Sequence, residues 1–452
     1  MAVPPPPSAD RTPVAFVVWG SLGDLHPFIA LGLELKARGV PVIVASHAEY
    51  RPKVEAEGLG FRPIRPSFAD LEAAFGTDRA GITRLLLRHP LWLLTRAILP
   101  FLEATIEDTR ALLDETPWLV TATAAIGARL AAEAQGAAWL AAVLQPMQFL
   151  SRRDPPVFMP GEWLAPAVRA LGPSAADALH ALVRWRLARL CRPVHEARRR
   201  LGLAPVPGDP LFTGQFGAAG TLALYSPLLG AAQPDYPPGV EITGYAFYDS
   251  EHGGGTDLPP SLADFLRAGE APVVFTLGSA FVHAPGDFYR VGAAAARRLG
   301  QRAVLLVGDD GLAAHGGFGS AAVHVAGYAA YSALFPQARA VVHQGGVGTL
   351  GQALRAGRPQ LVVPHFADQA DNAARVVRLG LAATLGRRAF TVDRLTRRLG
   401  ALLASPRAAA VAASVGRQVG EERGAARAAE AILRWRRDAA RTHERSHVEN
   451  SH

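Results

Sequence analysis

Short apolar runs alternate with stretches of helical periodicity along nearly the whole chain. The runs in the first half lie at residues 14–19, 40–45, 118–121 and 139–144, and those in the second half at 273–277, 303–307, 323–326, 340–343, 361–364 and 382–385. Short, fully apolar runs are typical of strands buried on both faces, and their alternation with helices is typical of parallel sheets. The pattern therefore predicts an α/β protein with two Rossmann-like, doubly wound domains.

A change in composition separates the two sets of strands. Residues 226–260 contain clustered prolines and a run of glycines, which predict a linker. The other boundaries follow from composition and periodicity: a proline-rich disordered tail at 1–12, an N-terminal domain at 13–225, a C-terminal domain at 261–424, a terminal helix at 425–440 and a polar disordered tail at 441–452. Two such domains predict a ligand-binding cleft between them.

The first strand and the helix after it predict a loop at one edge of the N-terminal sheet. Pro27 is of a type favoured at the first helical position, so we expect it to begin the helix, and Gly39 to end it. Residues 20–26 then lie at the carboxyl end of the strand, where open α/β sheets bind ligands.

A glycine-rich turn follows one of the apolar runs of the C-terminal domain. His343 ends the strand, and Gln-Gly-Gly-Val-Gly-Thr at 344–349 predicts a turn that opens a helix. Backbone N–H groups at a helix start have no partner within the helix and carry a partial positive charge, so they bind anions. The next strand, at 361–364, leads to Asp368 and Gln369 at the same sheet edge. Together these turns predict a site for a phosphate joined to a group with hydroxyls, such as a nucleotide sugar.

Both turns carry motifs of a known family. Residues 343–372 resemble the nucleotide-sugar signature of the glycosyltransferases of the UDP-glucosyl/glucuronosyl and macrolide type, and residues 20–28 resemble their opening Gly-Ser-x-Gly-Asp-x-x-Pro loop. Within the family, the sequence looks most similar to the rhamnosyltransferase of bacterial rhamnolipid synthesis, through residues 275–279, 286–289 and 368–380. The resemblance covers most of residues 14–400. It implies the GT-B architecture, two Rossmann-like domains facing across a cleft, with a terminal helix that crosses back onto the N-terminal domain.

The resemblance implies roles around the phosphates and the base. It places His343 on a phosphate oxygen, with Ser279 and Thr349 nearby, and Tyr328 against the nucleotide base. The expected donor site is completed by Gly345, Gly346, Gly348 and Asn372 in the C-terminal domain and by Gly20, Ser21 and Gly23 in the N-terminal loop. From the residues alone, a lone histidine at a strand end is usually part of the core, and that alternative stays open for His343.

Contacts to the sugar and the ribose are implied in the same way. Asp368 and Gln369 match the pair that holds hydroxyls of the donor sugar, and a cap at a helix start is the alternative for Asp368. Many members carry a glutamate near 351–352 that contacts the ribose, whereas this chain has Gly351 and Gln352. We therefore expect the ribose contact either through Gln352 or by a different route.

Transfer also needs a base, because an acceptor hydroxyl has a high pKa. The resemblance implies Asp24 as this base, with His26 as a second candidate, whereas capping of the following helix is the alternative role for Asp24. Plant members pair their base with an aspartate further along the domain, but residues 119–125 contain none. We therefore expect Asp24 to act without a partner. One base and no second nucleophile fit a single displacement, and the family implies inversion.

No metal and no other cofactor are expected. A metal-dependent transferase usually carries an Asp-x-Asp motif, and no two aspartates of this chain stand two positions apart. Asp309 and Asp310 are adjacent, which is a weak signal, and no histidines or cysteines show metal-ligand spacing. Fixed N–H donors of the glycine-rich turn are the alternative means of stabilising a leaving diphosphate.

Composition narrows the classes of partner. The chain has 452 residues, enough for two sizeable cores, and a formal net charge of +8. It shows no basic stripe with interleaved aromatics, so we expect no nucleic-acid partner. The single cysteine, Cys191, excludes a disulfide within the chain and favours the cytoplasm. No pattern indicates the oligomeric state.

Residues 82–102 bear on the acceptor, because an apolar run there is interrupted by three arginines. Three interpretations stay open: an ordinary core helix, an interfacial helix in peripheral contact with the inner face of the membrane, and the lining of an apolar acceptor pocket. The last one places Trp92 and Leu93 beside the acceptor and predicts a lipid-like or polycyclic alcohol.

Taken together, these features predict an inverting, metal-independent glycosyltransferase. It would move a hexose or deoxyhexose from a UDP- or dTDP-sugar to a hydroxyl of a hydrophobic small molecule. A nucleotide-sugar epimerase of the same architecture and a nonenzymatic helper of a partner glycosyltransferase are the alternatives. Asp24, His343 and Asp368 argue against the helper, because that role has no need of them.

Overall fold

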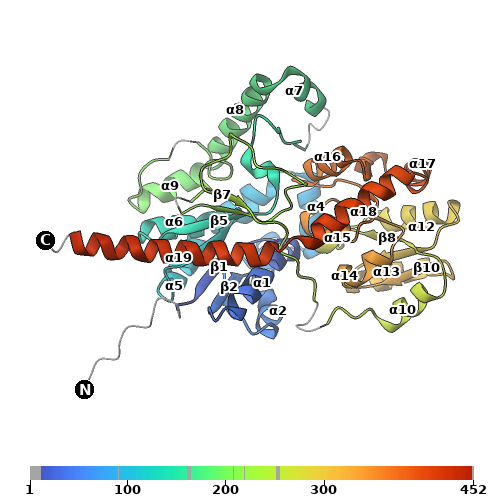
Figure 1. Ribbon diagram of the computed structural model, residues 1–452, viewed down its shortest axis with the longest axis horizontal. Coiled ribbons are helices and arrows are strands. Elements are labelled where there is room, and N and C mark those ends of the chain that lie inside the picture. Colours follow the sequence, from blue (N-terminus) through green and yellow to red (C-terminus); the bar gives the residue numbers. More distant parts are fainter. Residues whose placement is uncertain are drawn as a thin grey trace.

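Two α/β domains, each built on a parallel sheet covered by helices, make up the protein (Figure 1). The computed structural model describes residues 12–89, 91–159, 164–206, 208–217, 219–250 and 255–449. The predicted tail at 1–12 therefore lies outside the described residues, apart from its last position.

The N-terminal sheet has seven parallel strands in the order β3-β2-β1-β4-β5-β6-β7. They are β1 (Val14–Val17), β2 (Val42–Ser46), β3 (Gly60–Pro63), β4 (Leu119–Ala122), β5 (Trp139–Val143), β6 (Thr221–Ala223) and β7 (Val240–Ile242). The strand order reverses between β1 and β4, so the loop after β1 lies at the switch point where such sheets bind ligands.

The described residues of this half contain nine α-helices. They are α1 (Leu22–Ala37), α2 (Arg51–Ala56), α3 (Phe68–Phe75), α4 (Arg79–Arg88), α5 (Leu102–Leu113), α6 (Ile126–Ala134), α7 (Ala165–Leu171), α8 (Pro173–Leu190) and α9 (Arg192–Arg200). Helices α7 and α8 form a hairpin that projects away from the sheet at the top of Figure 1.

The C-terminal sheet has six parallel strands in the order β10-β9-β8-β11-β12-β13. They are β8 (Val273–Thr276), β9 (Ala303–Leu306), β10 (Val323–Ala326), β11 (Ala340–His343), β12 (Gln360–Val362) and β13 (Ala382–Thr384). Its helices are α10 (Pro260–Arg267), α11 (Gly278–Phe281), α12 (Phe288–Arg298), α13 (Leu312–His315), α14 (Tyr331–Leu334), α15 (Val347–Arg355), α16 (Gln369–Leu379), α17 (Val392–Leu403) and α18 (Pro406–Glu421). The strand order again reverses beside β11, which places the glycine-rich turn at the ligand-binding edge.

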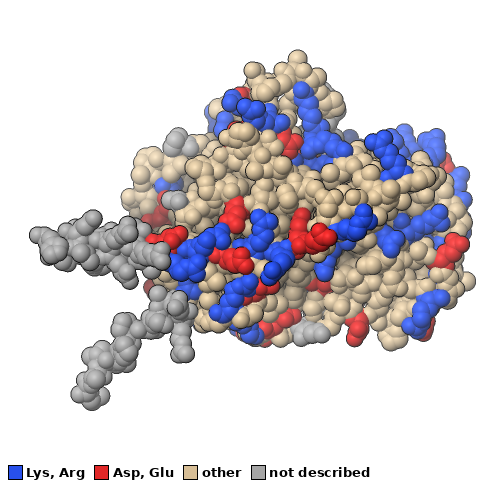
Figure 2. All heavy atoms as spheres, viewed as in Figure 1, with Lys and Arg blue, Asp and Glu red and all other residues tan. Residues whose placement is uncertain are grey.

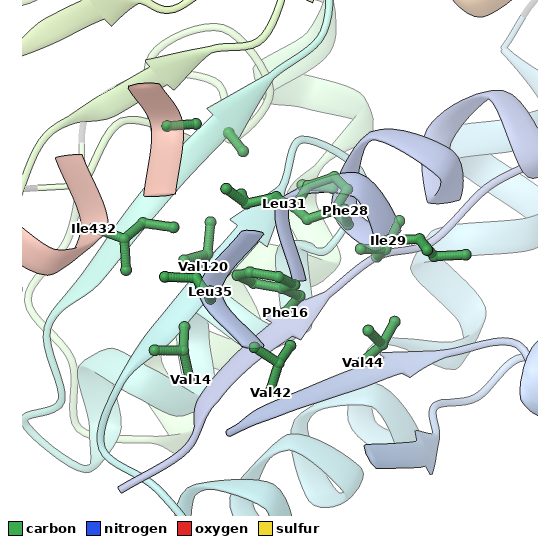
Figure 3. Packing of buried hydrophobic residues seen from close by; sticks show 14 of the residues in the cluster. Val14, Phe16, Phe28, Ile29, Leu31, Leu35, Val42, Val44, Val120 and Ile432 are labelled. Atoms are coloured by element: carbon green, nitrogen blue, oxygen red, sulfur yellow. The ribbon is translucent and has the colours of Figure 1, made fainter. Parts of the chain in front are cut away.

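The last helix, α19 (Gly424–Glu449), crosses back onto the N-terminal domain, as predicted. Figure 3 shows how it closes the N-terminal core: Ile432 lies with Leu31 and Leu35 of α1 and with the strand residue Phe16. Each large apolar side chain that is buried in this way contributes about 1.5–3 kcal/mol to folding. The crossing helix therefore ties the end of the chain to the first βαβ unit.

The start of α1 differs from the prediction. The helix begins at Leu22 instead of Pro27, so Pro27 lies within it. Ser21 is the N-cap, and the carboxylate of Asp24 in the first turn accepts a hydrogen bond from the Ser21 backbone N–H at 2.8 Å. This capping arrangement starts the helix early. Because proline has no N–H, Pro27 donates no bond to the carbonyl of Gly23.

Two boundaries predicted from composition are also wrong. Strand β7 lies inside the segment 226–260 that was predicted as a linker, so the N-terminal sheet extends to residue 242. Strands β3 and β6 were missed. The terminal helix continues to Glu449, past the predicted boundary at 440, and residues 450–452 lie outside the described part.

Charge is spread over the visible surface. On the face shown in Figure 2, basic and acidic side chains are interspersed across the middle of the molecule. In the described residues, no single helix is long and apolar enough to cross a membrane. One pair bent by 70°, Val392–Leu403 with Pro406–Ala439, passes that test by length and composition when its members are taken together.

Candidate active site

A cavity of about 1020 Å³ lies between the two domains. Its walls come from the first turns of α1, from residues 245–249 in the segment that joins the domains, and from strand ends and helix starts of the C-terminal sheet. Residues from both domains therefore meet in one site.

The N-termini of α1 and α15 meet at this cavity. A Cβ atom added to Gly348 would lie 3.6 Å from the Cα of Gly23, an ordinary contact distance, so the two helix starts lie close together. Gly345 has a φ of +93°, and a Cβ there would come within 2.7 Å of Val362 Cγ1, so the turn before α15 requires glycine. Gly346 is the N-cap of α15. Two helix starts facing one cavity form an arrangement suited to a diphosphate.

Hydroxyl groups stand beside these helix starts. Ser279 and Thr349 both line the cavity. Thr276 Oγ1 lies 2.9 Å from the hydroxyl of Tyr331 and accepts a hydrogen bond from the Gly278 N–H at 3.2 Å. The polar wall next to the glycine-rich turn is therefore held in place by its own hydrogen bonds.

Gln352 brings a polar atom into the same wall. Its side chain is 5% exposed and lines the cavity, and its Oε1 has no hydrogen-bond partner within the described part of the chain. A buried acceptor without a partner costs about 1–3 kcal/mol, so this oxygen favours a ligand hydroxyl. Gly351 is required beside it, because a Cβ there would lie 2.8 Å from the ring of Tyr245.

Tyr328 lines the cavity after β10, where the sequence predicted an aromatic residue for the base. Its hydroxyl donates a hydrogen bond to the backbone carbonyl of Asp249 at 2.8 Å. The carboxylate of Asp249 accepts one from the Ser332 N–H at 2.6 Å. The joining segment thus fixes the ring of Tyr328 against the cavity wall.

Asp24 takes part in capping α1 from within its first turn, whereas the capping alternative from the sequence placed it ahead of a helix beginning near Pro27. Its Oδ2 accepts hydrogen bonds from the backbone N–H and, at 3.1 Å, from the hydroxyl of Ser21. A Cβ on Gly20 would overlap this carboxylate, so glycine leaves room for it. Burial raises the pKa of Asp24, whereas the hydrogen bonds from Ser21 lower it. Capping and proton transfer do not exclude each other, and the base role stays a prediction.

His26 faces the cavity two residues further along α1. Its ring meets the ring of Tyr248 edge-on, with centroids 5.1 Å apart, and its Nε2 has no partner among the residues described. Burial lowers the pKa of His26 to about 3, helped by the charge of Lys53. The imidazole is therefore neutral near pH 7.

Asp368 is the N-cap of α16 in the C-terminal domain and is not among the described residues that line the cavity. The Asn372 side chain donates hydrogen bonds to Asp368 Oδ2 at 2.6 Å and to the carbonyl of Gly345 at 2.9 Å, which ties the start of α16 to the glycine-rich turn. Burial raises the pKa of Asp368 to about 7, and the charge of Asp24 adds to the increase. The two carboxyl groups therefore lie within electrostatic reach across the domain boundary.

Gln369 supports the turn that carries Asp368. Its Oε1 accepts hydrogen bonds from the backbone N–H groups of His365 at 2.8 Å and Phe366 at 3.1 Å. The side chain is almost fully buried. Its observed contacts are thus internal, and the predicted contact with a sugar hydroxyl stays a prediction.

Two family models match the chain. Residues 14–145 match the glycosyltransferase family 28 N-terminal domain, and residues 320–426 match the C-terminal domain of erythromycin biosynthesis protein CIII-like proteins. The chain is 33% identical over 413 residues to O-mycaminosyltylonolide 6-deoxyallosyltransferase of Streptomyces fradiae. The aligned region spans 88% of this chain and 89% of that protein. The protein belongs to the glycosyltransferase family that these two models and this relative represent. This protein is also 28% identical to the vancomycin aglycone glucosyltransferase of Amycolatopsis orientalis, over 86% of this chain and 90% of that enzyme.

Solved structures share the fold of the glycosyltransferase. The glycotransferase of kitacinnamycin superposes with a TM-score of 0.64 at 24% identity, covering 94% of this chain and 99% of that protein. The glycosyltransferase VinC in complex with dTDP superposes with a TM-score of 0.63 at 21% identity and the same coverage. The predicted GT-B architecture is confirmed.

His343 does not lie on the cavity wall of the glycosyltransferase. Its side chain is 0% exposed, its Nδ1 accepts a hydrogen bond from the Gly345 N–H at 3.0 Å, and its Nε2 lies 2.9 Å from Gln360 Oε1. Burial lowers the pKa of His343 to about 4, so the ring is neutral. This geometry fits the core interpretation, in which His343 shapes the glycine-rich turn. The predicted phosphate contact would need the ring to give up one of these bonds and stays a prediction.

We expect His343→Ala to lower the free energy of unfolding by about 1–3 kcal/mol, because the change leaves buried groups on Gly345 and Gln360 unpaired. Urea denaturation measures this loss. If His343 also contacts a phosphate, we expect the same variant to bind dTDP more weakly by about 1.5–3 kcal/mol, as measured by calorimetry. Unchanged dTDP affinity in the folded variant would leave His343 with the core role alone.

Trp92 and Leu93 belong to a packed cluster of the N-terminal domain. Trp92 is 7% exposed, and its ring centroid lies 4.7 Å from that of Phe75. The same cluster contains Trp19 and Ile82, and Leu93 packs against it. Neither Trp92 nor Leu93 is among the described residues that line the cavity. The packing fits the core interpretation, and a place beside the acceptor stays a prediction.

The aromatic residues of the joining segment were missed from the sequence. Tyr245, Phe247 and Tyr248 line the cavity, although proline and glycine composition predicted a plain linker there. Their close spacing within a polar stretch was a signal, because exposed linkers rarely carry clustered aromatics. In the described residues, no group of three or more His, Cys, Asp or Glu side chains is arranged to hold a metal ion.

Proposed function

We propose that this glycosyltransferase is an inverting, metal-independent enzyme that moves a hexose or deoxyhexose from a UDP- or dTDP-sugar to a hydroxyl of an apolar acceptor. The observation that carries the proposal is the meeting of the α1 and α15 N-termini at one cavity, with Asp24 and Asp368 in electrostatic reach of each other. Backbone N–H groups at the helix starts can bind the diphosphate. One carboxyl group can accept the proton of the acceptor hydroxyl, and the other can hydrogen-bond the sugar hydroxyls.

The proposed reaction is a single displacement. The acceptor oxygen bonds to the anomeric carbon while its proton passes to the carboxylate of Asp24. The bond from that carbon to the diphosphate breaks, and its electron pair stays on the diphosphate oxygen. Backbone N–H groups at the start of α15 stabilise the added charge without reorganisation.

The choice of donor and acceptor is supported by the relatives. VinC has been solved with dTDP, and the Streptomyces fradiae relative is named a 6-deoxyallosyltransferase of a tylonolide. We propose a dTDP- or UDP-linked sugar and a lipid or polycyclic natural product on this basis. The likeness to the rhamnolipid enzyme, and with it a rhamnosyl donor, stays a prediction, as do cytoplasmic location and peripheral membrane contact.

Family membership favours transfer over the two alternatives from the sequence. The relatives named above are transferases that carry a sugar to an acceptor. An epimerase of this shape would release no sugar to an acceptor, and a helper would turn over no donor. Release of nucleoside diphosphate that depends on an acceptor distinguishes the proposal from both.

Tyr328 tests the position of the nucleotide base. We expect Tyr328→Ala to weaken dTDP binding by about 1–3 kcal/mol, the usual range for a base stacked on an aromatic ring. Tyr328→Phe keeps the ring and loses the bond to Asp249, so we expect it to retain most of the affinity. Calorimetric titration of both folded variants measures the difference. If the Ala and Phe variants bind dTDP with equal affinity, the nucleotide base does not stack on Tyr328.

Metal dependence tests the means of stabilising the diphosphate. We expect initial rates in EDTA to stay close to those in Mg²⁺, because fixed N–H donors at α15 act on the leaving group. Rates are compared after extensive chelation and after addition of Mg²⁺ or Mn²⁺. Complete loss in chelator, restored by either ion, would falsify the metal-free mechanism. Modest stimulation is compatible with it, because divalent ions help a released diphosphate to leave.

A further inference from the structure

A network of buried ions crosses the boundary between the two domains at α16. The side chain of Arg375 on this helix is 1% exposed, and its Nε donates a hydrogen bond to Asp371 Oδ2 at 2.6 Å. Its Nη1 pairs with Asp154, in the loop after β5, and donates to the carbonyl of Leu229 at 3.2 Å, in the loop between β6 and β7. Arg378 adds a bond to Asp154 Oδ1 at 3.1 Å. One guanidinium of the C-terminal domain thus contacts two loops of the N-terminal domain.

We propose that Arg375 is a positioning residue for glycosyl transfer, because it holds the N-terminal domain in a fixed position relative to the start of α16. The inference rests on the proposed function, in which Asp24 of the N-terminal domain acts on a sugar held by Asp368 of the C-terminal domain. Neither Arg375 nor Asp154 is among the described residues that line the cavity between the domains. The network therefore acts on the site through the elements that it joins.

Contacts within the N-terminal domain hold the Asp154 end of the network. Ser151 Oγ donates a hydrogen bond to Asp235 Oδ1 at 2.8 Å, and Asp235 Oδ2 accepts one from the Arg152 N–H at 2.8 Å. The Asp154 N–H donates to Ser151 Oγ at 3.2 Å. The loop therefore presents the Asp154 carboxylate from a position that its own domain fixes.

The α16 end of the network is tied to the donor side of the site. Asp371 is fully buried in the first turn of α16, and its Oδ1 accepts a hydrogen bond from the Val157 N–H at 3.0 Å. The Asn372 side chain joins the same turn to Asp368 and to the carbonyl of Gly345. A shift of α16 relative to the loop after β5 would therefore carry Asp368 and the glycine-rich turn with it.

Burial and geometry make this junction selective for one arrangement of the domains. A guanidinium that keeps its burial and loses a carboxylate partner is an uncompensated charge, which is strongly unfavourable. The planar fork of N–H donors on Arg375 also fixes the direction of each bond. A displacement of about 1 Å between reacting groups can slow a reaction about a hundredfold. A junction that sets the position of one domain on the other is therefore expected to affect the rate of transfer more than donor binding.

Asp154→Ala tests the junction from the side of the N-terminal domain. The change removes the partner of Arg375 and Arg378 and leaves the pair of Arg375 with Asp371 within α16. We expect kcat for transfer of glucose from dTDP-glucose to 2,6-dihydroxynaphthalene to decrease at least about tenfold. The KM for dTDP-glucose and the calorimetric affinity for dTDP are expected to change less than about threefold, because the contacts proposed at α15 and Asp368 lie within the C-terminal domain.

A matched control breaks an exposed ion pair of the same loop. Asp177→Ala removes the partner of Arg152, and the two side chains of that pair are 53% and 50% exposed. We expect it to change kcat less than about twofold, because exposed ion pairs contribute little.

Arg375→Lys separates the charge of Arg375 from its geometry. Lysine keeps the positive charge and loses the planar fork that reaches Asp371, Asp154 and the carbonyl of Leu229 together. We expect this variant to lose kcat at least about tenfold as well. Full activity in Arg375→Lys would show that charge alone is needed and would overturn the positioning role.

A distance measurement distinguishes positioning from a general loss of stability. Spin labels are attached at Ala56→Cys on α2 and at Arg398→Cys on α17, two exposed positions in different domains. Cys191 is buried, so it stays unlabelled. With dTDP bound, we expect a single narrow distribution of distances for the otherwise unchanged chain and for Asp177→Ala. A broader or shifted distribution is expected for Asp154→Ala.

Each result decides one point. Unchanged kcat in Asp154→Ala, or a distance distribution that matches the unchanged chain, would overturn the positioning role. A loss of kcat with an equal loss of dTDP affinity would also overturn it, because the change would then disturb the nucleotide site itself. Wild type that transfers no sugar, together with a broadened distribution in Asp154→Ala, would contradict the proposed function and leave the junction between the domains in place. If Asp154→Ala does not fold, Asp154→Asn takes its place, because it keeps the shape of the side chain and loses the charge.

Discussion

Asp24→Asn is expected to lower the rate of glycosyl transfer by about 10²–10⁴-fold while the affinity for dTDP changes little. An asparagine can still accept the hydrogen bond from the Ser21 N–H, so α1 keeps its cap. It cannot take a proton from an acceptor hydroxyl at neutral pH. The variant therefore separates the observed capping role of Asp24 from its proposed role as base. Initial rates, calorimetry and thermal denaturation of the same sample measure all three effects.

Two control variants accompany this measurement. Ser21→Ala removes the hydroxyl contact and keeps the carboxylate, so we expect it to retain most transfer activity. His26→Ala removes the other candidate base, whose Nε2 is buried and has no partner among the described residues. If Asp24→Asn keeps most of the activity and His26→Ala does not, the base is His26.

The pH dependence has a defined sign. Burial raises the pKa of Asp24, so the carboxyl group stays protonated to a higher pH than an exposed aspartate. Only the ionised form accepts a proton. Transfer is therefore expected to increase as pH rises through this raised pKa, and Asp24→Asn is expected to remove that limb of the profile.

Asp368→Asn is the second change with a large expected effect. We expect kcat/KM for the nucleotide sugar to decrease about 10- to 150-fold, which corresponds to the loss of one charged hydrogen bond of about 1.5–3 kcal/mol. The Asn372 side chain orients the Asp368 carboxyl at 2.6 Å, and this group is proposed to hold hydroxyls of the sugar. Because dTDP contains no donor sugar, its affinity is expected to stay nearly constant. Equal losses for dTDP and dTDP-glucose would show that the change disturbs the glycine-rich turn instead.

The two carboxyl groups also predict a coupling. The pKa of Asp368 is raised to about 7, first by burial and then by the charge of Asp24. Removing that charge in Asp24→Asn is expected to lower the pKa of Asp368 and to move the pH profile of donor binding to lower pH. An unmoved profile would contradict the proximity of the two groups.

All six strands of the C-terminal sheet lie within predicted apolar runs or one residue from them, and the central strands β8 and β11 bury every side chain. Burial alone does not decide which strands can be predicted, because β6 is fully buried and was missed, whereas β13 has no fully buried residue and was predicted. Strand β3 has one buried residue in four, and the edge strand β7 follows a proline-rich stretch. Their pairing comes from the neighbouring strand, which a local pattern does not contain.

The start of α1 illustrates a conflict between two local signals. Pro27 is favoured at a first helical position, whereas Ser21 and Asp24 form a capping pair. The helix starts at the capping pair: β1 ends at Val17, and the short turn after it places Ser21 at the N-cap. Pro27 is the sixth residue of the helix, so the carbonyl of Gly23 loses the hydrogen bond that an N–H at position 27 would have donated.

The spacing of the motifs placed Ser279, Tyr328, Gly348 and Thr349 in segments whose residues line the cavity, and it did not identify their contacts. The bond from His343 to Gln360 joins two strands, and the contact of Tyr328 with Asp249 joins two distant segments. Such tertiary partners leave no periodic signal, so the sequence could not indicate them.

The most direct test of inverting transfer is the configuration of the product. The enzyme is incubated with an α-linked dTDP- or UDP-glucose and 2,6-dihydroxynaphthalene, and the anomeric coupling of the product is read by NMR while released nucleoside diphosphate is counted. We expect one diphosphate released for each product molecule, dependence of that release on the acceptor, and a β-linked sugar. An α-linked product, or release that does not depend on the acceptor, would contradict the account.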